Sequence, residues 1–219
     1  MPFFFRRILI GLYEWLACSE AASDVDLIFV PAGRQTRKLC ALRMVADGRA
    51  SRLLLSVGRY EVRSFDELTA RRPNLRQIAA LISPRRRHFF VHLSNEGSEI
   101  KLVRKGYFGT LTEISALREW LEKHKEIRSV LIVSSAPHLR RLRLCGRRLL
   151  TPLVEFRLAM VTGEDASLRE DQWWRTNRTR MMVLGELPKL LLYKIYLGLP
   201  LEPPRTALPR LIRILNETS

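Results

Sequence analysis

The stretch VLIVSSAPHLRRLRL, residues 130–144, joins a short apolar run to a basic helical pattern. Its β-branched start predicts a buried strand, which ends at Ser134 and Ser135. Pro137 then suits the first turn of a helix, because the backbone N–H that proline lacks has no partner there. A strand that passes directly into a helix is the repeating unit of α/β proteins, so this stretch indicates the fold class.

Similar apolar runs occur on both sides of this stretch, and helical patterns separate them. We expect strands at DLIFVP, RLLLSVG, RHFFVHL and VEFRLAMV, an additional edge strand at EIKLVRKG, and helices over residues 34–47 and 110–124. This alternation favours an α/β fold, a Rossmann-like three-layer sandwich with a mostly parallel sheet of about five strands and helices on both faces. After the last strand, a helix that starts at DQWW should break near Gly185 to Pro188, before a second apolar helix.

We expect three segments along the chain. An amphipathic helix occupies residues 1–22, the α/β domain residues 23–200 with an insertion at about 62–90, and a basic tail residues 201–219. Arg6, Arg7 and Glu14 interrupt the first apolar run, which is too short for a membrane span and unlike a cleaved signal peptide. This helix is expected to pack on the domain or to lie on a membrane surface.

The net charge is strongly positive. The chain has 38 Lys and Arg residues against 22 Asp and Glu residues, a formal charge of +16. Such a field favours an anionic small molecule, an anionic membrane face or nucleic acid as partner. Alternatively, the codon usage of a GC-rich genome favours arginine and would produce the same excess of positive charge without any functional role. Specific nucleic-acid binding is not expected, because no recognition motif accompanies the charge.

The cysteines indicate a reducing compartment. Cys18, Cys40 and Cys145 form no C-x-x-C pair, so neither a zinc ribbon nor a disulfide framework is indicated. We therefore expect a cytoplasmic protein, with peripheral contact to the inner membrane as an open alternative.

Candidate site residues follow four of the predicted strands and helices. Ligands of parallel α/β sheets bind at the carboxyl ends of the strands, which points to the loops PAGRQTR, SVGRYE, GYFGTLTE and SSAPHLRR. The candidate ligand-binding residues are Gly33, Arg34, Ser56, Gly58, Thr110, Ser135 and Arg141, and the candidate catalytic residues are His138 and Glu113.

The SSAPHLRR loop has two readings. The start of its helix is a ready site for an anion, where His138 would transfer a proton or donate to a phosphate and Arg141 would clamp the charge. Alternatively, Ser135 only caps the helix and the arginines form a solvated face.

The other three loops also have a structural alternative. In the PAGRQTR loop, Gly33 would let the backbone approach a ligand, and Arg34 or Arg37 would supply positive charge. In the SVGRYE loop, Ser56 and Gly58 could simply form a tight turn, which needs no ligand. In the third loop Glu113 would act as acid, base or hydroxyl-binding group, although Thr110 and Glu113 also fit a capping box.

Other signatures of chemistry are weak. His88 and His92 lie four apart on one face of a predicted strand, yet no carboxylate motif accompanies them, and no metal site is expected. Neither GxGxxG nor GxxxxGK[ST] occurs, so the sequence names no cofactor. Trp173 and Trp174 are expected in the core or at an interface, since no aromatic and basic residues alternate around them.

Taken in order, LIFVPAGRQTRKLCAL, LLLSVGRYE, GTLTEISAL and VLIVSSAPHLRRL resemble the ElyC/SanA/YdcF family, bacterial proteins with a Rossmann-like α/β domain. The resemblance covers roughly residues 24–199. Its most specific element is the family's VTSxxHxxRA loop, which carries over Ser135, His138 and Arg141. In this chain SVG replaces the family's SGG, Glu113 stands where many members have asparagine, and the N-terminal helix is shorter than the membrane helix of SanA-type members.

The resemblance implies a crevice for a phosphate-bearing or nucleotide-like ligand and a link to bacterial cell-envelope upkeep. It supplies no defined reaction, so whether the chain is an enzyme stays open. The alternative function is that of a non-catalytic envelope factor at the membrane surface.

Overall fold

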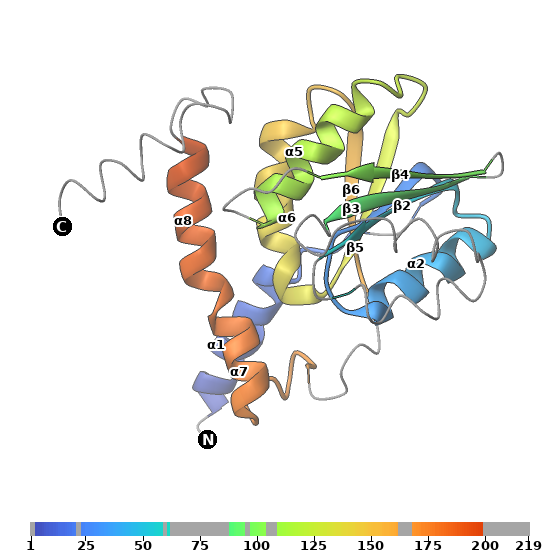
Figure 1. The fold of residues 1–219 in the computed structure, drawn as a ribbon. Coiled ribbons are helices and arrows are strands. Elements are labelled where there is room, and N and C mark those ends of the chain that lie inside the picture. Colours follow the sequence, from blue (N-terminus) through green and yellow to red (C-terminus); the bar gives the residue numbers. More distant parts are fainter. Residues whose placement is uncertain are drawn as a thin grey trace.

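The computed structural model describes residues 3–20, 23–58, 61, 88–94, 97–103, 109–161 and 168–198 (Figure 1). The strands are β1 (Val25–Val30), β2 (Ala50–Val57), β3 (Phe89–Ser94), β4 (Gly97–Leu102), β5 (Ser129–Ser134) and β6 (Glu155–Met160). The helices are α1 (Phe3–Leu16), α2 (Gln35–Ala46), α5 (Gly109–Leu121), α6 (Ala136–Leu149), α7 (Asn177–Leu184) and α8 (Glu186–Gly198).

The strands form one sheet in the order β4-β3-β2-β1-β5-β6. β1, β2, β5 and β6 are parallel, which confirms the predicted α/β fold with a mostly parallel sheet. The described residues contain six strands where about five were expected, and the additional one is the predicted edge strand, β4. β3 is antiparallel to both β2 and β4, so Phe89 at its start pairs with Val57 at the end of β2. The beginning of β3 therefore lies at the carboxyl edge of the parallel strands.

Alternating side chains of the strands form a core on each face of the sheet. On one face, Phe29 and Ile132 pack with residues of α5, α6 and α8. On the other face, Ile28 and Val133 pack with residues of α2 such as Ala41. Figure 1 shows the same three layers, with α2 on one side of the sheet and α5 and α6 on the other. The central strands are apolar on both faces, which is why their sequences are continuous apolar runs.

A third cluster joins α1 to α7 and α8. α1 contributes Tyr13 and Leu16 to this cluster, α7 contributes Val183 and α8 contributes Leu190, and Ala136 of α6 belongs to it as well. Trp173 is buried in the same cluster and donates from Nε1 to the carbonyl oxygen of Leu9 at 3.1 Å. The expected N-terminal helix is thus present as α1, and Trp173 is a core residue as predicted.

The late helical segment differs from the prediction at its start. The predicted helix began at DQWW, but α7 begins at Asn177, because the side chain of Thr176 accepts from the amide of Thr179 and caps the helix there. The predicted break is confirmed. α7 ends at Leu184 and α8 starts at Glu186, with Gly185 between them. Glycine fits this position because a Cβ there would lie 2.5 Å from the carbonyl oxygen of Met181.

Part of the predicted organisation lies outside the described residues. This applies to positions 62–87 of the predicted insertion and to the predicted basic tail over 201–219. Within the described part of the chain, no helix combines the length and the apolar character that crossing a bilayer would require.

Candidate functional site

The loops after β1, β2 and β5 meet at the carboxyl edge of the sheet. β1 lies between β2 and β5, so the chain order reverses beside β1, and ligands of open α/β sheets bind at such a point. A Cβ at Gly58 would lie 3.3 Å from the Cβ of Ala32, which shows that the first two loops are in contact.

Arg37, in the first turn of α2, connects this helix to the start of α6. Its Nη2 donates to the Ser135 hydroxyl at 2.6 Å, and its side chain is largely buried. Gly33 makes room for this guanidinium, because a Cβ there would lie 2.7 Å from Nη1 of Arg37, and its φ of +150° also favours glycine. Ser135 precedes the first residue of α6, but its side chain caps no amide of the helix. The capping alternative for Ser135 is therefore wrong, and its hydroxyl faces a cation instead.

A second hydroxyl lies next to this contact. Ser134 is fully buried at the end of β5, and its Oγ has no hydrogen-bond partner among the described residues. A buried hydroxyl left unsatisfied costs about 1–3 kcal/mol, and such groups concentrate at functional sites.

The Glu113 carboxylate links three segments at the same edge. Its Oε1 accepts from the amide of Ala32 at 2.7 Å and from the hydroxyl of Ser56, and it lies 3.6 Å from Nε2 of His88. Nε2 of His88 is also 3.1 Å from the Ser56 hydroxyl. The capping-box alternative is wrong, because α5 begins before Thr110 and the Glu113 carboxylate is turned toward the strands.

Thr110 and Glu113 occupy the same side of the first turns of α5. Thr110 is buried, as is Glu113, so neither belongs to a solvated helix face. The structure therefore brings two of the predicted residues together, Ser56 and Glu113, and adds His88 to them. Thr110 is buried one turn earlier on α5.

His138, Arg141 and Glu186 form a second cluster, on α6 and α8. Arg141 donates from Nε to Oε2 of Glu186 at 2.9 Å and from Nη2 to Oε1 at 3.2 Å, a bidentate ion pair. The Nη2 of Arg141 also lies 2.6 Å from Nδ1 of His138. A guanidinium can only donate, so Nδ1 accepts and the neutral imidazole carries its hydrogen on Nε2.

The surroundings of His138 keep it uncharged. Burial lowers its pKa from 6.5 to about 4, the cations of Arg141 and Arg37 act in the same direction, and Glu186 offsets part of the effect. Burial alone would raise the pKa of Glu186, but its contacts with His138 and Arg141 lower it to about 2. At neutral pH the cluster therefore holds a carboxylate, a guanidinium and a neutral imidazole.

This cluster changes the expected roles of two residues. A solvated arginine face is ruled out for Arg141, whose side chain is only 12% exposed and is bound to Glu186. The Arg141 guanidinium, which was expected to bind the negative charge of a ligand, is instead bonded to the Glu186 carboxylate. Arg141 thus orients His138, while Arg37 lies nearer to the strand ends.

A buried ion pair borders the loop after β2. Lys38 of α2 is almost fully buried and bonded to the carboxylate of Glu61. Burial raises the pKa of Glu61, and Lys38 counteracts this shift. Arg34, a predicted site residue, reaches α7 and contacts the sulfur of Met182 at 3.5 Å.

The two histidines of the β3 region have separate surroundings. His92 lies 5.0 Å from the ring of Trp120 and 6.1 Å from that of His124, measured between ring centroids, whereas His88 belongs to the Glu113 contacts. Among the described residues, no three His, Cys, Asp or Glu side chains come together as metal ligands would.

Sequence reasoning missed His88 as a partner of Glu113, Lys38 as a buried cation, and Glu186 altogether. A weak signal for Glu186 existed. It is the sole charged residue in the stretch MMVLGELP, directly after the glycine that separates two helices. Lys38 and His88 carry no comparable pattern.

No protein-family model, no curated protein and no solved structure matches this chain. Membership of the ElyC/SanA/YdcF family therefore stays a prediction, and the geometry of the site has to carry the functional argument.

Proposed function

We propose that this protein binds an anionic small molecule, phosphate-bearing or nucleotide-like, at the carboxyl edge of the sheet between β1 and β5. The hydrogen bond from Arg37 to Ser135 carries this proposal. It holds a buried guanidinium at the point where the strand order reverses, beside the first turn of α6.

The charge at this point favours a phosphate over a neutral ligand. The first turn of α6 contributes the positive end of a helix dipole, equivalent to about half an elementary charge. Arg37 contributes a full charge, and its planar fork matches two phosphate oxygens. Arg37 is therefore the larger of the two effects, and the helix dipole adds to it.

The neighbouring groups suit the remainder of such a ligand. His138 is neutral and has its hydrogen on Nε2, so it serves as a hydrogen-bond donor and not as a general base at neutral pH. Glu113 offers a carboxylate that accepts from hydroxyl groups, and it is the group assigned to any proton transfer.

The resemblance to the ElyC/SanA/YdcF family supports the same ligand class and adds a role in bacterial cell-envelope upkeep. That resemblance rests on Ser135, His138 and Arg141, all of which surround the start of α6. A non-catalytic role at the membrane surface is the alternative, and it depends on other side chains, those exposed on α1, α7 and α8.

The test is a binding screen with matched arginine variants. Nucleotides, sugar phosphates, isoprenoid phosphates and S-adenosylmethionine are added to the full chain, and hits from thermal shift are titrated by calorimetry. Arg37→Gln should weaken a true ligand about 10- to 150-fold, the equivalent of a lost charge-assisted hydrogen bond of about 1.5–3 kcal/mol. Ser135→Ala should weaken it less, because the guanidinium remains.

The matched control is Arg43→Gln, which removes the same charge from an exposed position of the same helix. It should leave the affinity unchanged. Equal losses in both arginine variants would show that only the overall positive field attracts the probe. The proposal is refuted if no probe stabilises the wild type, or if Arg37→Gln binds as tightly as the wild type.

A further inference from the structure

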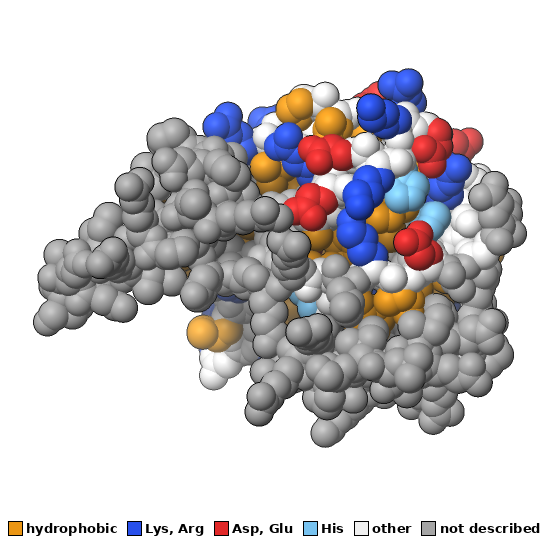
Figure 2. All heavy atoms as spheres, turned by 45° about the horizontal axis from the view of Figure 1, so that its top comes forward, with side chains coloured by type: hydrophobic (Ala, Val, Ile, Leu, Met, Phe, Trp, Pro, Cys, Tyr) orange, Lys and Arg blue, Asp and Glu red, His pale blue; other side chains and the backbone are white. Residues whose placement is uncertain are grey.

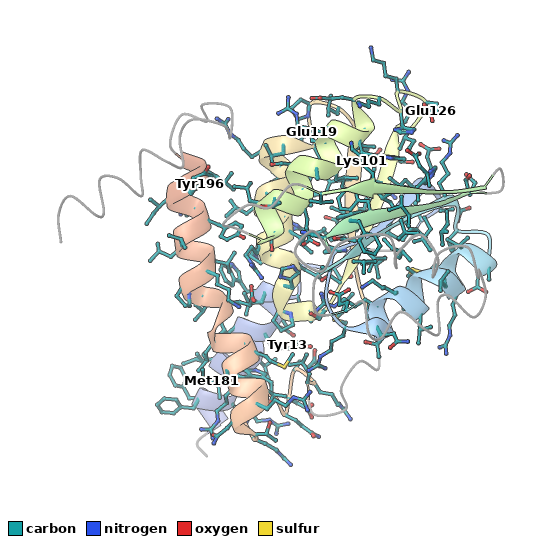
Figure 3. All side chains as sticks on the ribbon, in the orientation of Figure 1. Tyr13, Lys101, Glu119, Glu126, Met181 and Tyr196 are labelled. Atoms are coloured by element: carbon teal, nitrogen blue, oxygen red, sulfur yellow. The ribbon has the colours of Figure 1, made fainter. Side chains whose placement is uncertain are left out.

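Exposed apolar side chains form a continuous stripe along α7 and α8. The spacing follows one helix face across the break at Gly185. Met181 is 74% exposed and Leu191 61% exposed, and several such side chains on one helix face are more informative than single exposed apolar residues. Figure 3 places Met181 on the side of α7 that is turned away from the sheet. The stripe consists of Met181, Leu184, Leu191, Leu192 and Ile195.

α1 carries a second exposed apolar stripe. Phe4, Ile8 and Trp15 recur at helical spacing, and Phe4 packs edge-on against Phe5. The opposite side of α1 is buried in the cluster that holds Ala136 of α6, Val183 of α7 and Leu190 of α8. Figure 1 shows α1 and α7 together at the end of the molecule that is farthest from the edge strand β4.

Basic side chains flank both stripes. Six exposed cations accompany the apolar residues of these three helices, whereas Glu14 is the one exposed acid of their described residues and Glu186 is buried. The cations are Arg6, Arg7, Arg178, Arg180, Lys189 and Lys194. By contrast, Figure 2 shows a face of the molecule on which basic and acidic side chains are intermixed.

We propose that the outer faces of α1, α7 and α8, defined by these stripes and cations and called here the helical surface, dock on an anionic lipid bilayer. Leu, Ile, Met and Phe side chains would enter the boundary between headgroups and acyl chains, and Trp15 would lie at the headgroups. The cations would remain among the lipid phosphates. This inference goes beyond ligand binding and does not depend on it.

Charge decides between a bilayer and a second copy of the chain as the occupant. Two copies that met through this surface would bring their cations together, and like charges across an interface are repulsive. An anionic bilayer attracts the same cations. No described helix could span the bilayer, so the contact would be peripheral.

The experiment is flotation of the full chain, without added ligand, with vesicles of two kinds. One kind contains phosphatidylcholine and phosphatidylglycerol in a two-to-one ratio, and the other contains phosphatidylcholine alone. The wild type should float with the anionic vesicles and stay behind with the neutral ones. Binding should weaken as salt is added, because screening reduces the attraction between the cations and the lipid headgroups.

Two double variants test the two components of the helical surface. Arg6→Gln with Arg7→Gln should reduce the partition coefficient about 25-fold, since each basic residue near the surface contributes about five-fold. Leu191→Gln with Ile195→Gln should reduce it at least ten-fold on the same vesicles. Both pairs are exposed, so thermal unfolding should remain close to that of the wild type.

The control is Lys123→Gln with Lys125→Gln, which removes two exposed charges next to Glu126, at the far end of the molecule in Figure 3. Its binding should stay within about two-fold of the wild type. The proposal is overturned by a wild type that does not float with anionic vesicles, or by a control that loses as much as the arginine variant. It is also overturned if the leucine and isoleucine substitutions abolish a dimer, detected by sedimentation, and leave flotation unchanged.

Discussion

Replacing His138 with asparagine should change how the stability of the protein depends on pH. The Oδ1 of asparagine can accept from Arg141 as Nδ1 of His138 does, but asparagine does not titrate. The folded protein holds the imidazole neutral, with a pKa lowered to about 4 by burial, while the unfolded chain has the ordinary value of 6.5.

The sign follows from the direction of that shift. Between pH 6.5 and 4 the unfolded chain binds a proton at His138 and the folded protein does not, so acid favours unfolding. The stability due to the neutral histidine is complete above pH 6.5 and is lost as the pH falls through this window. From these two pKa values, the loss between pH 7 and pH 5 amounts to about 2 kcal/mol.

Urea unfolding curves measured at half-unit steps from pH 7.5 to 4.5 provide the assay. The free energy of unfolding of the wild type should fall more steeply toward acid than that of His138→Asn. Between pH 7 and pH 5, the difference in free energy of unfolding between the two proteins should change by about 2 kcal/mol. The slope will not vanish in the variant, because burial also lowers the pKa of His92. Parallel curves, separated by a constant offset, would refute the reasoning, because they would mean that His138 titrates normally in the folded protein.

Two glycines should respond to alanine in ways that helix propensity does not predict. Gly146→Ala should destabilise the protein by about 1–3 kcal/mol in urea unfolding, since the added Cβ would lie 2.7 Å from the ring of Phe156. The control Gly11→Ala, which meets nothing within 4 Å, should instead stabilise by about 0.5–1 kcal/mol, and the opposite order would contradict the packing argument. Gly33→Ala should lower the thermal midpoint and displace Arg37 from Ser135. The strained backbone alone should lower the free energy of unfolding by about 1–3 kcal/mol. An unchanged midpoint would show that the loop relaxes without strain.

Most of the fold could be predicted from the sequence because its central strands are apolar on both faces. Runs such as VDLIFV in β1 and SVLIVS in β5 are short and β-branched, and amphipathic helical patterns separate them. The direction of β3 could not be predicted, since the alternation of side chains is the same in parallel and antiparallel strands. The start of α7 was misplaced because apolar Trp173 and Trp174 precede it and extend the helical pattern beyond the cap at Thr176.

The candidate site was predictable only where a residue follows its strand directly. Ser56 lies near the end of β2 and Ser135 directly follows β5, so their position at the carboxyl edge of the sheet follows from topology. The partners of these residues depend on long-range packing. Arg141 meets Glu186 across 45 residues, and Glu113 meets Ala32 across 81, with no local pattern to indicate either contact.

The packing of α1 against the segment before α7 joins residues that are made at very different times. Tyr13 donates from its hydroxyl to the carbonyl of Leu168, 155 residues later. A ribosome that adds about 5–20 residues per second needs about 8 to 30 s to reach that partner. During this interval the inner side of α1, with Leu16, has nothing from α7 or α8 to cover it. Tyr13 and Leu16 of α1 therefore acquire their partners from Leu168, α7 and α8 only after all six described strands of the sheet have been made.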